Sequence, residues 1–364
     1  MIILGIDTSC DDTCVSVVKI KNQKSKVKNF EILSNVISSQ VKLHAKYGGV
    51  YPFLAKREHQ RNLAPVFKKA LKETRLLKLK IKNQKSKIDA IAVTVGPGLE
   101  PCLWQGVNFA KELAQKLKLP IIPVNHIEAH ILANWLNTQI NTTNRNTNLH
   151  KTLFPAVCLV VSGGHTELIL MRGIGKYRLI GETRDDAAGE CFDKVARILG
   201  LGYPGGPIVA KMVTKIKNQE SRIKNIKLPR PMIYQKNYDF SFSGLKTAVL
   251  YEVKKLKTLN LKLKTEFCKE VQQAIIDVLI HKTLKAAKDF KVNSIILGGG
   301  VAANDELRKQ FKLKIENCKL KINFLVPPKN LCTDNAAMVA MTAYYHRKEK
   351  FNLSEIKADA NLKI

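Results

Sequence analysis

The sequence predicts an α/β protein made of two lobes around a central cleft. The chain has 364 residues, short apolar runs alternate with helical patterns, and a strand–turn–strand block at 2–20 is echoed by another at 154–173. A chain of this length usually forms more than one domain. Alternating strand and helix patterns are typical of sheets covered by helices. We therefore expect two lobes, each built on a sheet that starts with a hairpin.

The first half of the chain contains four strand patterns and one clear helix pattern. Short apolar runs indicate strands, and apolar residues at helical spacing indicate a helix. The third strand runs directly into a Gly-Pro turn at 96–98. The predicted strands are MIILGID at 1–7, CVSVVKI at 14–20, DAIAVTV at 89–95 and PIIPVNH at 120–126, and the predicted helix is GVNFAKELAQKL at 106–117.

The second half opens with a strand, a Gly-Gly turn and a second strand at 154–173, and later has a strand, a triple glycine and a helix at 293–311. Between these, residues 185–200 run from two aspartates into an amphipathic helix. Its apolar face is predicted to consist of Ala188, Phe192, Val195 and Leu199. We place the first lobe at 1–130, the second at 131–340 and a C-terminal extension at 341–364.

Positive charge dominates the composition. The chain has 61 Lys and Arg against 30 Asp and Glu, a formal net charge of +31, which favours a polyanionic partner such as nucleic acid. Three near-identical segments at 19–27, 80–88 and 215–223 carry +4, +4 and +2, so +21 remains without them. We interpret them as surface insertions at connections, where added length costs little entropy. RNA-binding loops are the alternative.

Other features of the composition exclude whole classes of protein. No apolar run approaches the 18 or more residues of a membrane helix. The first strand leads to Asp7, Asp11 and Asp12 instead of following a basic start as in a signal peptide. The eight cysteines contain no CxxC pair, so reduced and mostly structural thiols are expected. These observations predict a cytoplasmic protein.

Four glycine-rich turns indicate a nucleotide-binding cleft. Glycine allows positive φ and close backbone approach, so main-chain N–H groups can face an anion. A turn that leads into a helix N-terminus also favours phosphate. Neither a P-loop nor a GxGxxG fingerprint is present. The turns are VGPG at 95–98, VSGGHT at 161–166, GYPGGP at 202–207 and GGGVAAN at 298–304.

Five polar residues near these turns are candidates for binding. His126 and His130 are four positions apart, so on a helix both could reach one metal ion, although such pairs are more often surface or core residues. Asp334 heads an apolar helix, either as a cap or as a third, carboxylate ligand. Asp193 could bond a ribose or base, or be solvated surface. Asn304 could contact a nucleotide or simply cap its helix.

Six motifs, in this order, resemble the TsaD family of tRNA N6-adenosine threonylcarbamoyltransferases, formerly called glycoprotease-like proteins. They cover almost the whole chain outside the three repeats. The motifs are NHIEAH, VSGGHTELI, DDAAGECFDKVARILGLGYPGGP, FSFSGLKTAV, GGGVAAN and CTDNAAM. The resemblance, closest to the bacterial type, implies an actin-like, sugar-kinase-type ATPase fold. It also implies transfer of the threonylcarbamoyl group of threonylcarbamoyl-AMP to N6 of adenosine 37 in tRNAs reading codons that begin with A.

The resemblance also implies cofactors, partners and site residues. The metal ligands would be His126, His130 and Asp334, with Fe²⁺ expected and Zn²⁺ as the alternative. The partners would be tRNA, a smaller paralogous subunit and a P-loop ATPase subunit, with no membrane association. The residues that bind threonylcarbamoyl-AMP would be Val160, Val161, Ser162, Gly163, Gly164, Asp193, Gly206 and Asn304.

One departure and three rival classes of protein qualify the resemblance. Asp7 and Asp12 stand where the family usually has glutamates. A metalloprotease of the HExxH type would need a Glu directly after His126, where this chain has Ile127. A sugar or acetate kinase would share the fold but would not need the histidine pair. A non-catalytic nucleic-acid-binding subunit would explain the charge but not the full set of ligand motifs.

Overall fold

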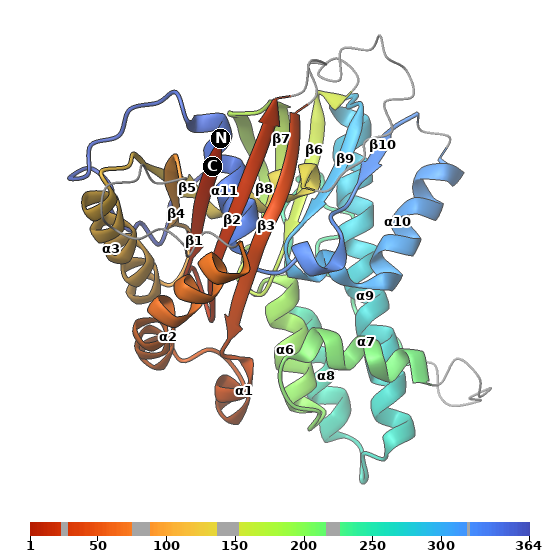
Figure 1. The fold of residues 1–364 in the computed structure, drawn as a ribbon. Coiled ribbons are helices and arrows are strands. Elements are labelled where there is room, and N and C mark those ends of the chain that lie inside the picture. The colour runs from red at the N-terminus through yellow and green to blue at the C-terminus, as the bar shows by residue number, and fades with distance from the viewer. Residues whose placement is uncertain (23–27, 75–87, 137–152, 216–225, 319–320) are drawn as a thin grey trace. The chain divides into compact units, whose positions relative to one another are not determined.

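The computed structural model describes residues 1–22, 28–74, 88–136, 153–215, 226–318 and 321–364 (Figure 1). Contacts between Cα atoms divide the chain into two compact units. Unit 1 consists of Met1–His44, Val50–Asn141 and Asn330–Ile364, and unit 2 of Ala45–Gly49 and Thr142–Lys329. Each unit is an α/β structure around one five-stranded sheet, as the alternating strand and helix patterns predicted.

The sheet of unit 1 has the strand order β3-β2-β1-β4-β5. β1 and β2 form the predicted antiparallel hairpin, and β2 pairs antiparallel with β3, a strand that the sequence pattern did not reveal. β4 runs parallel to both β1 and β5. The strands are β1 (Ile2–Asp7), β2 (Asp12–Asn22), β3 (Lys28–Ser39), β4 (Ala90–Gly96) and β5 (Ile121–Asn125).

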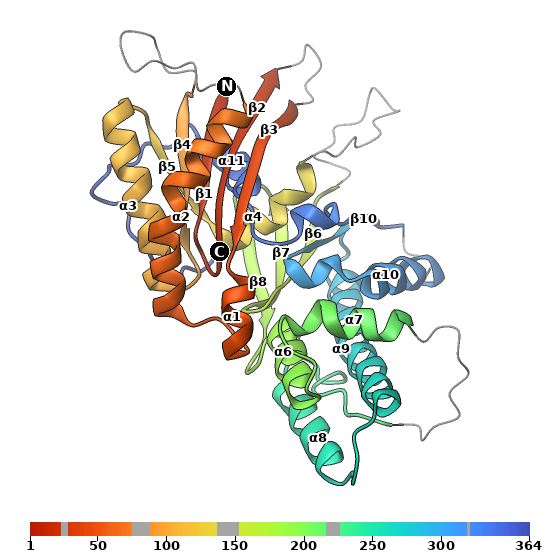
Figure 2. The same ribbon diagram turned by 60° about the horizontal axis from the view of Figure 1, so that its bottom comes forward.

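Helices cover the two faces of this sheet. α2 and α3 pack on one face, and α11 packs on the other against β1, β2 and α4 (Figure 2). Side chains of a strand point alternately to the two faces. Leu4 and Ile6 belong to the core under α2 and α3, whereas Gly5 contacts α11. The helices are α1 (Val41–His44), α2 (Pro52–Glu73), α3 (Glu100–Leu117), α4 (His126–Leu132) and α11 (Ala336–His346).

The alternation along β1 places Asp7 on the face that carries α11. At Gly5 an added Cβ would lie 2.1 Å from the carbonyl oxygen of Ala336, so glycine allows α11 to approach the sheet closely. α3 begins at Glu100, six residues before the predicted helix start. The end of β1, α4 and the segment before α11 are thereby brought to one region of unit 1.

The sheet of unit 2 repeats this topology. Its order is β10-β9-β6-β7-β8, in which β6 forms a hairpin with β7 and runs parallel to β9. β6 corresponds to β1 of unit 1, its antiparallel hairpin partner β7 to β2, and its parallel neighbour β9 to β4. The predicted similarity between the two blocks is therefore confirmed. The strands are β6 (Ala156–Val161), β7 (Thr166–Gly173), β8 (Lys176–Glu182), β9 (Ser294–Gly298) and β10 (Asn323–Leu325).

The helices of unit 2 pack as a connected group, with α7 against α6 and α9, and α8 against α6. The predicted apolar face of α6 is confirmed, because Ala188, Phe192, Val195 and Leu199 are all buried. The helices are α6 (Ala188–Ile198), α7 (Gly205–Lys215), α8 (Ser243–Lys254), α9 (Leu261–Asp289) and α10 (Asp305–Asn317). In the part of the chain that the structure describes, short 3-10 helices lie at Ala45–Tyr47, Ala133–Trp135, Gly300–Ala303 and Lys329–Leu331.

The unit boundaries differ from the predicted boundaries at 130 and 340. Asn330–Ile364 belongs to unit 1 because α11, which is apolar on all sides, packs against the first sheet. Ala45–Gly49 belongs to unit 2 although its neighbours in sequence belong to unit 1. Apolar periodicity identifies a buried helix, but it does not say which sheet the helix covers.

One of the three basic repeats is not wholly an insertion. Residues 19–22 continue β2, where Ile20 is buried and pairs with Phe30 of β3. Residues 19 and 20 also belong to the predicted strand at 14–20. The interpretation of this copy as a surface connection is wrong for residues 19–22, because the unrecognised β3 provides a partner strand. The rest of this copy, and nearly all of the copies at 80–88 and 215–223, lie outside the residues that the structure describes.

Two further observations bear on the sequence predictions. None of the described helices is long and apolar enough to cross a membrane. All eight cysteines lie in the described part of the chain as free thiols, and six of them are buried.

Candidate functional site

The two histidines of the NHIEAH motif lie on one face of α4. The side-chain oxygen of Asn125 accepts hydrogen bonds from the N–H groups of Ile127 (2.9 Å) and Glu128 (3.1 Å), so it caps the helix. α4 therefore begins at His126, and the spacing of four residues stacks His126 and His130. Their ring centroids are 4.6 Å apart, and both residues are buried.

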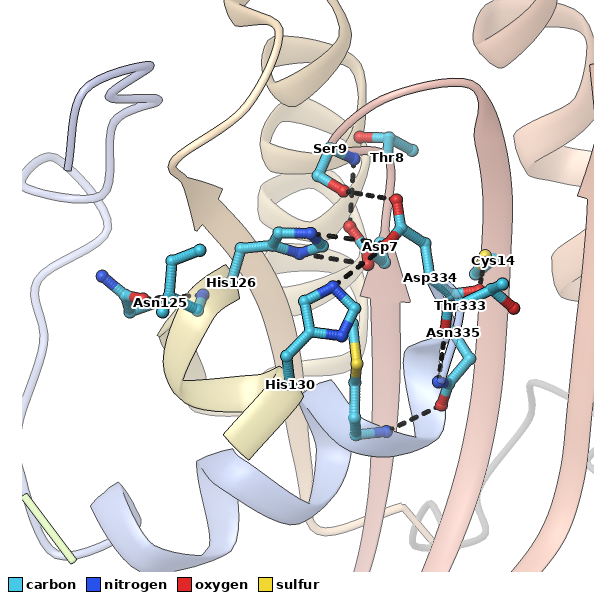
Figure 3. Close-up of polar contacts among 12 residues, drawn as sticks. Asp7, Thr8, Ser9, Cys14, Asn125, His126, His130, Thr333, Asp334 and Asn335 are labelled. Atoms are coloured by element: carbon cyan, nitrogen blue, oxygen red, sulfur yellow. Dashed lines mark hydrogen bonds and ion pairs between the residues drawn. The ribbon is translucent and has the colours of Figure 1, made fainter. Parts of the chain in front are cut away.

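Asp334 faces these histidines and is not a helix cap. The cap of α11 is Asn335, whose side-chain oxygen accepts the N–H of Met338 at 3.1 Å. Oδ1 of Asp334 lies 3.5 Å from Nε2 of His126 and 3.2 Å from Nε2 of His130 (Figure 3). Oδ2 accepts the hydroxyl of Ser9 at 3.4 Å. The capping alternative for Asp334 is therefore wrong, and the carboxylate is directed at the two imidazoles.

The distances among these three side chains fit a metal centre. One ligand atom from each lies within 4.8 Å of the others. Ligand atoms about 2.0–2.1 Å from a tetrahedral ion are roughly 3.3 Å apart, close to the separations of the two Nε2 atoms from Oδ1 of Asp334. The carboxylate side chain is 21% exposed while those of His126 and His130 are 7% and 1% exposed, so access from solvent is at Asp334.

Several buried polar atoms around this point lack hydrogen bonds. Among the described residues, Nδ1 of His126, both ring nitrogens of His130 and Oδ2 of Asp7 have no hydrogen-bond partner. Nε2 of His130 approaches Asp334 without hydrogen-bond geometry. Because buried polar groups are nearly always paired, this donor set fits a divalent cation. His126, His130 and Asp334 could hold it.

The electrostatics of the region also favour a cation. Burial lowers the pKa of His126, but Asp334 and Asp7 outweigh it and raise that pKa to about 9. Burial opposes ionisation of Asp334, yet the two imidazoles hold its pKa well below the ordinary value. Burial, followed by the charges of Asp334 and Asp11, raises the pKa of Asp12 to about 7. Buried carboxylates in excess of cations leave negative charge that a divalent ion would offset.

Glu128, between the two histidines in sequence, points elsewhere. Its Oε2 lies 2.9 Å from Nε2 of His346, at the end of α11, and Nδ1 of His346 lies 2.8 Å from Glu349. The Glu128–His346 pair joins α4 to α11. Glu128 is therefore not placed as the general base of a metalloprotease, and the pair connects the two helices next to the candidate metal-binding side chains.

In unit 2, the serine of the predicted anion-binding turn accepts hydrogen bonds from two N–H groups of that turn. Val160 and Val161 end β6 and are fully buried. The hydroxyl of Ser162 accepts hydrogen bonds from the N–H groups of Gly164 (3.3 Å) and His165 (3.1 Å), which the sequence suggested could face an anion. Gly163 and Gly164 are exposed, and none of the described atoms lies within 4 Å of an added Cβ at either.

Two other glycine motifs pack directly against this turn. The N–H of Gly189, in the first turn of α6, donates to the carbonyl of Ser162 at 3.1 Å, and an added Cβ there would lie 2.4 Å from that oxygen. Gly299 has φ +84°, and its Cβ would lie 2.4 Å from the carbonyl oxygen of Val161. The motifs VSGG, DDAAGE and GGGVAAN therefore meet at one place in unit 2, as a binding site would require.

Asp193 and Asn304 both have structural hydrogen bonds. Oδ1 of Asp193 accepts the N–H of Gly205 at 2.6 Å, so it caps α7, a helix other than its own. This capping role was not among the two roles that the sequence left open for Asp193, ligand binding and solvated surface. Asn304 caps α10 by accepting the N–H of Leu307 at 3.0 Å, and its amide donates to Gln272 at 2.9 Å. At Gly206 an added Cβ would meet its nearest neighbour at 4.0 Å, which leaves room.

Sequence reasoning missed several residues of these sites. Ser9, Gln272 and His346 carry no local pattern, because each acts on a residue far along the chain. Asp185 accepts the hydroxyls of Ser241 and Ser243, both at 2.6 Å, and the N–H of Phe242 at 2.8 Å. Asp185 thus anchors the FSFSG motif, and two adjacent aspartates before a helix were the available signal.

Solved structures with a similar fold support the predicted fold class. Full-length HypF in its phosphate- and nucleotide-bound form matches with a TM-score of 0.53 and 12% identity, covering 95% of this chain and 55% of that one. Component A of (R)-2-hydroxyglutaryl-CoA dehydratase from Acidaminococcus fermentans matches with a TM-score of 0.50 and 13% identity, covering 96% and 100%. The chain has the actin-like, sugar-kinase-type ATPase fold.

Sequence relatives identify the family. The model of the TsaD family, described as tRNA N6-adenosine threonylcarbamoyltransferase, matches residues 31–341. Enzymes of that name from Persephonella marina and Thermosipho africanus are each 46% identical, over 96% and 100% of this chain and 91% and 100% of theirs. The chain belongs to the family of tRNA N6-adenosine threonylcarbamoyltransferases, and it is a transferase that acts on tRNA.

Proposed function

We propose that this protein transfers the threonylcarbamoyl group of threonylcarbamoyl-AMP to N6 of adenosine 37 in tRNAs that read codons beginning with A. The observation that carries the proposal is the buried cluster of His126, His130 and Asp334 in a chain of this family, in which Nδ1 of His126 and both ring nitrogens of His130 have no hydrogen-bond partner among the described residues. A structural role alone would leave these buried polar atoms uncompensated. A kinase of the same fold would not need them.

The reaction needs alignment more than it needs a nucleophilic side chain. The mixed anhydride of threonylcarbamoyl-AMP is already activated, so the adenine amine can attack the carbamoyl carbon directly. A C–N6 bond forms, the bond from that carbon to the phosphate oxygen breaks, AMP leaves and N6 loses a proton. The protein must orient the two substrates and stabilise the charge that develops on the carbonyl oxygen.

Unit 2 is proposed to bind the adenylate. Val160, Val161, Ser162, Gly163 and Gly164 would form the turn against which the ligand lies, with Gly206, Asp193 and Asn304 nearby in the same unit. The space at Gly163, Gly164 and Gly206 supports this, because an added Cβ at those positions would meet none of the described atoms outside its chain neighbours closer than 4.0 Å. Asp193 and Asn304 would hold the backbone of the site through α7 and α10 as well as contact the ligand.

Unit 1 is proposed to hold the metal. Two histidines and one carboxylate with room for further ligands are typical of Fe²⁺ sites, and Zn²⁺ is the alternative. When bound, the metal would act as a Lewis acid toward a carbonyl or carboxylate of the threonylcarbamoyl group. His126 and His130 exclude water from their side of the site because they are buried, which leaves the side of Asp334 for substrate.

The partners and location are proposals of the same kind. The net charge, still +21 without the three repeats, supports binding to the tRNA backbone. We further propose a smaller paralogous subunit and a P-loop ATPase subunit as partners, and a cytoplasmic location where tRNA is available.

The test is complementation of a bacterium depleted of its own enzyme of this class. With the wild-type chain, a nucleoside digest of tRNA should contain N6-threonylcarbamoyladenosine at position 37, and purified protein should retain about one equivalent of metal. The His130→Ala variant is the matched negative control. If the folded wild-type protein is abundant in the cells and the modified nucleoside is absent, the proposal is wrong.

A further inference from the structure

We propose that Asp7 is the carboxylate that orients His126 in the metal centre: it accepts the Nδ1–H of His126 and thereby leaves Nε2 for the metal. This inference rests on the metal site of the proposed function. Asp7 would act through His126 and would not itself bind the ion, so it is a positioning residue.

One oxygen of the Asp7 carboxylate is held by the backbone, and the other faces His126. It is the last residue of β1 and is fully buried on the face that carries α11. Its Oδ1 accepts the N–H of Ser9 at 3.0 Å, which holds the plane of the carboxylate. Its Oδ2 has no hydrogen-bond partner among the described residues and lies 3.6 Å from Nδ1 of His126 (Figure 3). A buried carboxylate oxygen without a donor indicates an interaction that is completed when the site is loaded.

The geometry also selects the metal-binding nitrogen of each ring. Nε2 of His126 and Nε2 of His130 both approach the same atom, Oδ1 of Asp334, at 3.5 and 3.2 Å. The two Nε2 atoms therefore converge on one point, and Nδ1 of His126 is turned toward Asp7. A neutral imidazole carries one N–H, so a ring that binds metal through Nε2 must carry its proton on Nδ1.

A metal-binding histidine usually donates its second ring nitrogen to a carboxylate, carbonyl or water, which fixes the tautomer and the ring orientation. For His126 that acceptor is Oδ2 of Asp7. The same reasoning argues against Asp7 as a fourth ligand, because its carboxylate is on the Nδ1 side of the ring and Asp334 is on the Nε2 side. The cluster of side chains that could hold one ion contains His126, His130 and Asp334 and does not contain Asp7.

The first test measures metal affinity by competition with a zinc chelator, without any activity assay. Asp7→Ala should weaken Zn²⁺ binding about 10–100-fold, the usual cost of losing such an orienting partner. Asp7→Asn should weaken it much less, because the amide oxygen can still accept the Nδ1–H. Asp11→Ala is the matched control, since it removes a nearby carboxylate from the turn that follows Asp7, and it should have a smaller effect than Asp7→Ala.

The second test uses the wild-type protein and does not depend on how variants fold. Nitrogen chemical shifts of ¹⁵N-histidine-labelled, zinc-loaded protein should show His126 bound through Nε2 with a proton on Nδ1. Binding through Nδ1 would overturn the inference. So would an Asp7→Ala variant with wild-type zinc affinity, or an Asp7→Asn variant that loses zinc as completely as His126→Ala, which would make Asp7 a ligand.

These outcomes are separate from failure of the proposed function. If the zinc-loaded protein shows the expected tautomer of His126 but does not transfer threonylcarbamoyl to tRNA, the inference on Asp7 holds and the assigned reaction fails. If the reaction proceeds and Asp7→Ala binds zinc normally, only the inference fails.

Discussion

The polar residues of the two units differ in how their hydrogen bonds are satisfied. In unit 1, His126, His130 and Asp7 are buried with polar atoms that have no hydrogen-bond partner among the described residues. In unit 2, Ser162, Asp193 and Asn304 all accept backbone N–H groups of neighbouring turns and helices. The first site needs an external group to complete it. The second is already hydrogen-bonded within the folded chain and would offer the proposed adenylate a preformed surface.

This difference predicts different failures. Substituting His126 or His130 in unit 1 should remove a bound ion with little loss of folding free energy, because these side chains have few hydrogen-bond partners among the described residues. Substituting one of these polar residues in unit 2 should lower both folding stability and ligand binding. Substituting an exposed glycine of unit 2 should lower ligand binding alone. The four experiments below test this contrast.

The largest effect is expected from the metal-binding side chains. His126→Ala, His130→Ala and Asp334→Ala should each reduce bound metal well below one equivalent and lower transfer by more than about 100-fold, since a three-ligand site loses affinity and geometry together. Metal analysis and a tRNA nucleoside digest measure this. His281→Ala, on the exposed surface of α9, is the control and should keep its metal. Full occupancy in Asp334→Ala would remove the carboxylate from the site.

A pair of glycines in unit 2 separates ligand binding from folding. Gly163→Ala should leave the Tm nearly unchanged, because none of the described atoms lies within 4 Å of the new Cβ, while binding of a non-hydrolysable adenylate analogue falls about tenfold, or about 1.4 kcal/mol. Gly189→Ala should lower the Tm markedly because its Cβ would overlap the carbonyl of Ser162. Calorimetry and analogue titration measure the two effects, and unchanged analogue binding in Gly163→Ala would contradict the adenylate assignment.

The buried carboxylate of Asp12 should make unit 1 sensitive to pH. Burial raises its pKa in the folded protein to about 7, above the unfolded value of 3.8, so the folded state binds more protons between these pH values. The free energy of unfolding of the metal-free protein should therefore fall as the pH rises from about 4 to 7. Asp12→Asn should show a smaller fall, because the raised pKa values of Asp7 and Asp11 still contribute, and should gain stability relative to wild type at pH 8 but not at pH 4. An equal difference at both pH values in denaturant titrations would refute it.

The smallest effect is expected at Asp193. Asp193→Ala removes the acceptor for the N–H of Gly205 and should cost about 1 kcal/mol of unfolding free energy, whereas Asp193→Asn keeps an oxygen acceptor and should cost only a few tenths. Both variants should bind tRNA with the wild-type salt dependence, because the residue is assigned to the adenylate and not to the RNA backbone. A changed salt slope in Asp193→Ala would argue against that assignment.

The sequence was sufficient for the periodic parts of the fold. Strands with continuous apolar runs, such as Ile2–Asp7 and Ala156–Val161, and the amphipathic helix Ala188–Ile198 were predicted because burial imposes a period on side chains. Strand Lys28–Ser39 was missed because it is half-buried at the sheet edge and its apolar positions do not form a run. The position of α11 on the first sheet depends on long-range packing that no local pattern records.

The candidate site shows the same limit. His126 and His130 could be read from their spacing, because both lie on one short helix. The sequence could not show whether Asp334 caps its helix or faces the histidines. Asn335 is an equally good cap, and only the fold decides between them. The cap that Asp193 provides for α7 was invisible for a similar reason: its partner, Gly205, is not in its own helix.

α11 packs on the first sheet although it follows unit 2 in sequence, and this affects the order in which the two units can fold on the ribosome. The strands of unit 1 are synthesised first, but α11, which covers one face of β1 and β2, and Asp334 are synthesised only after all of unit 2. A nascent chain that has not reached Ala336 would expose the apolar face around Ile3 and lack the carboxylate opposite His130. Unit 2 is thus positioned to fold before unit 1 is complete, while unit 1 and its proposed metal site must wait until Asn330–Ile364 has been synthesised.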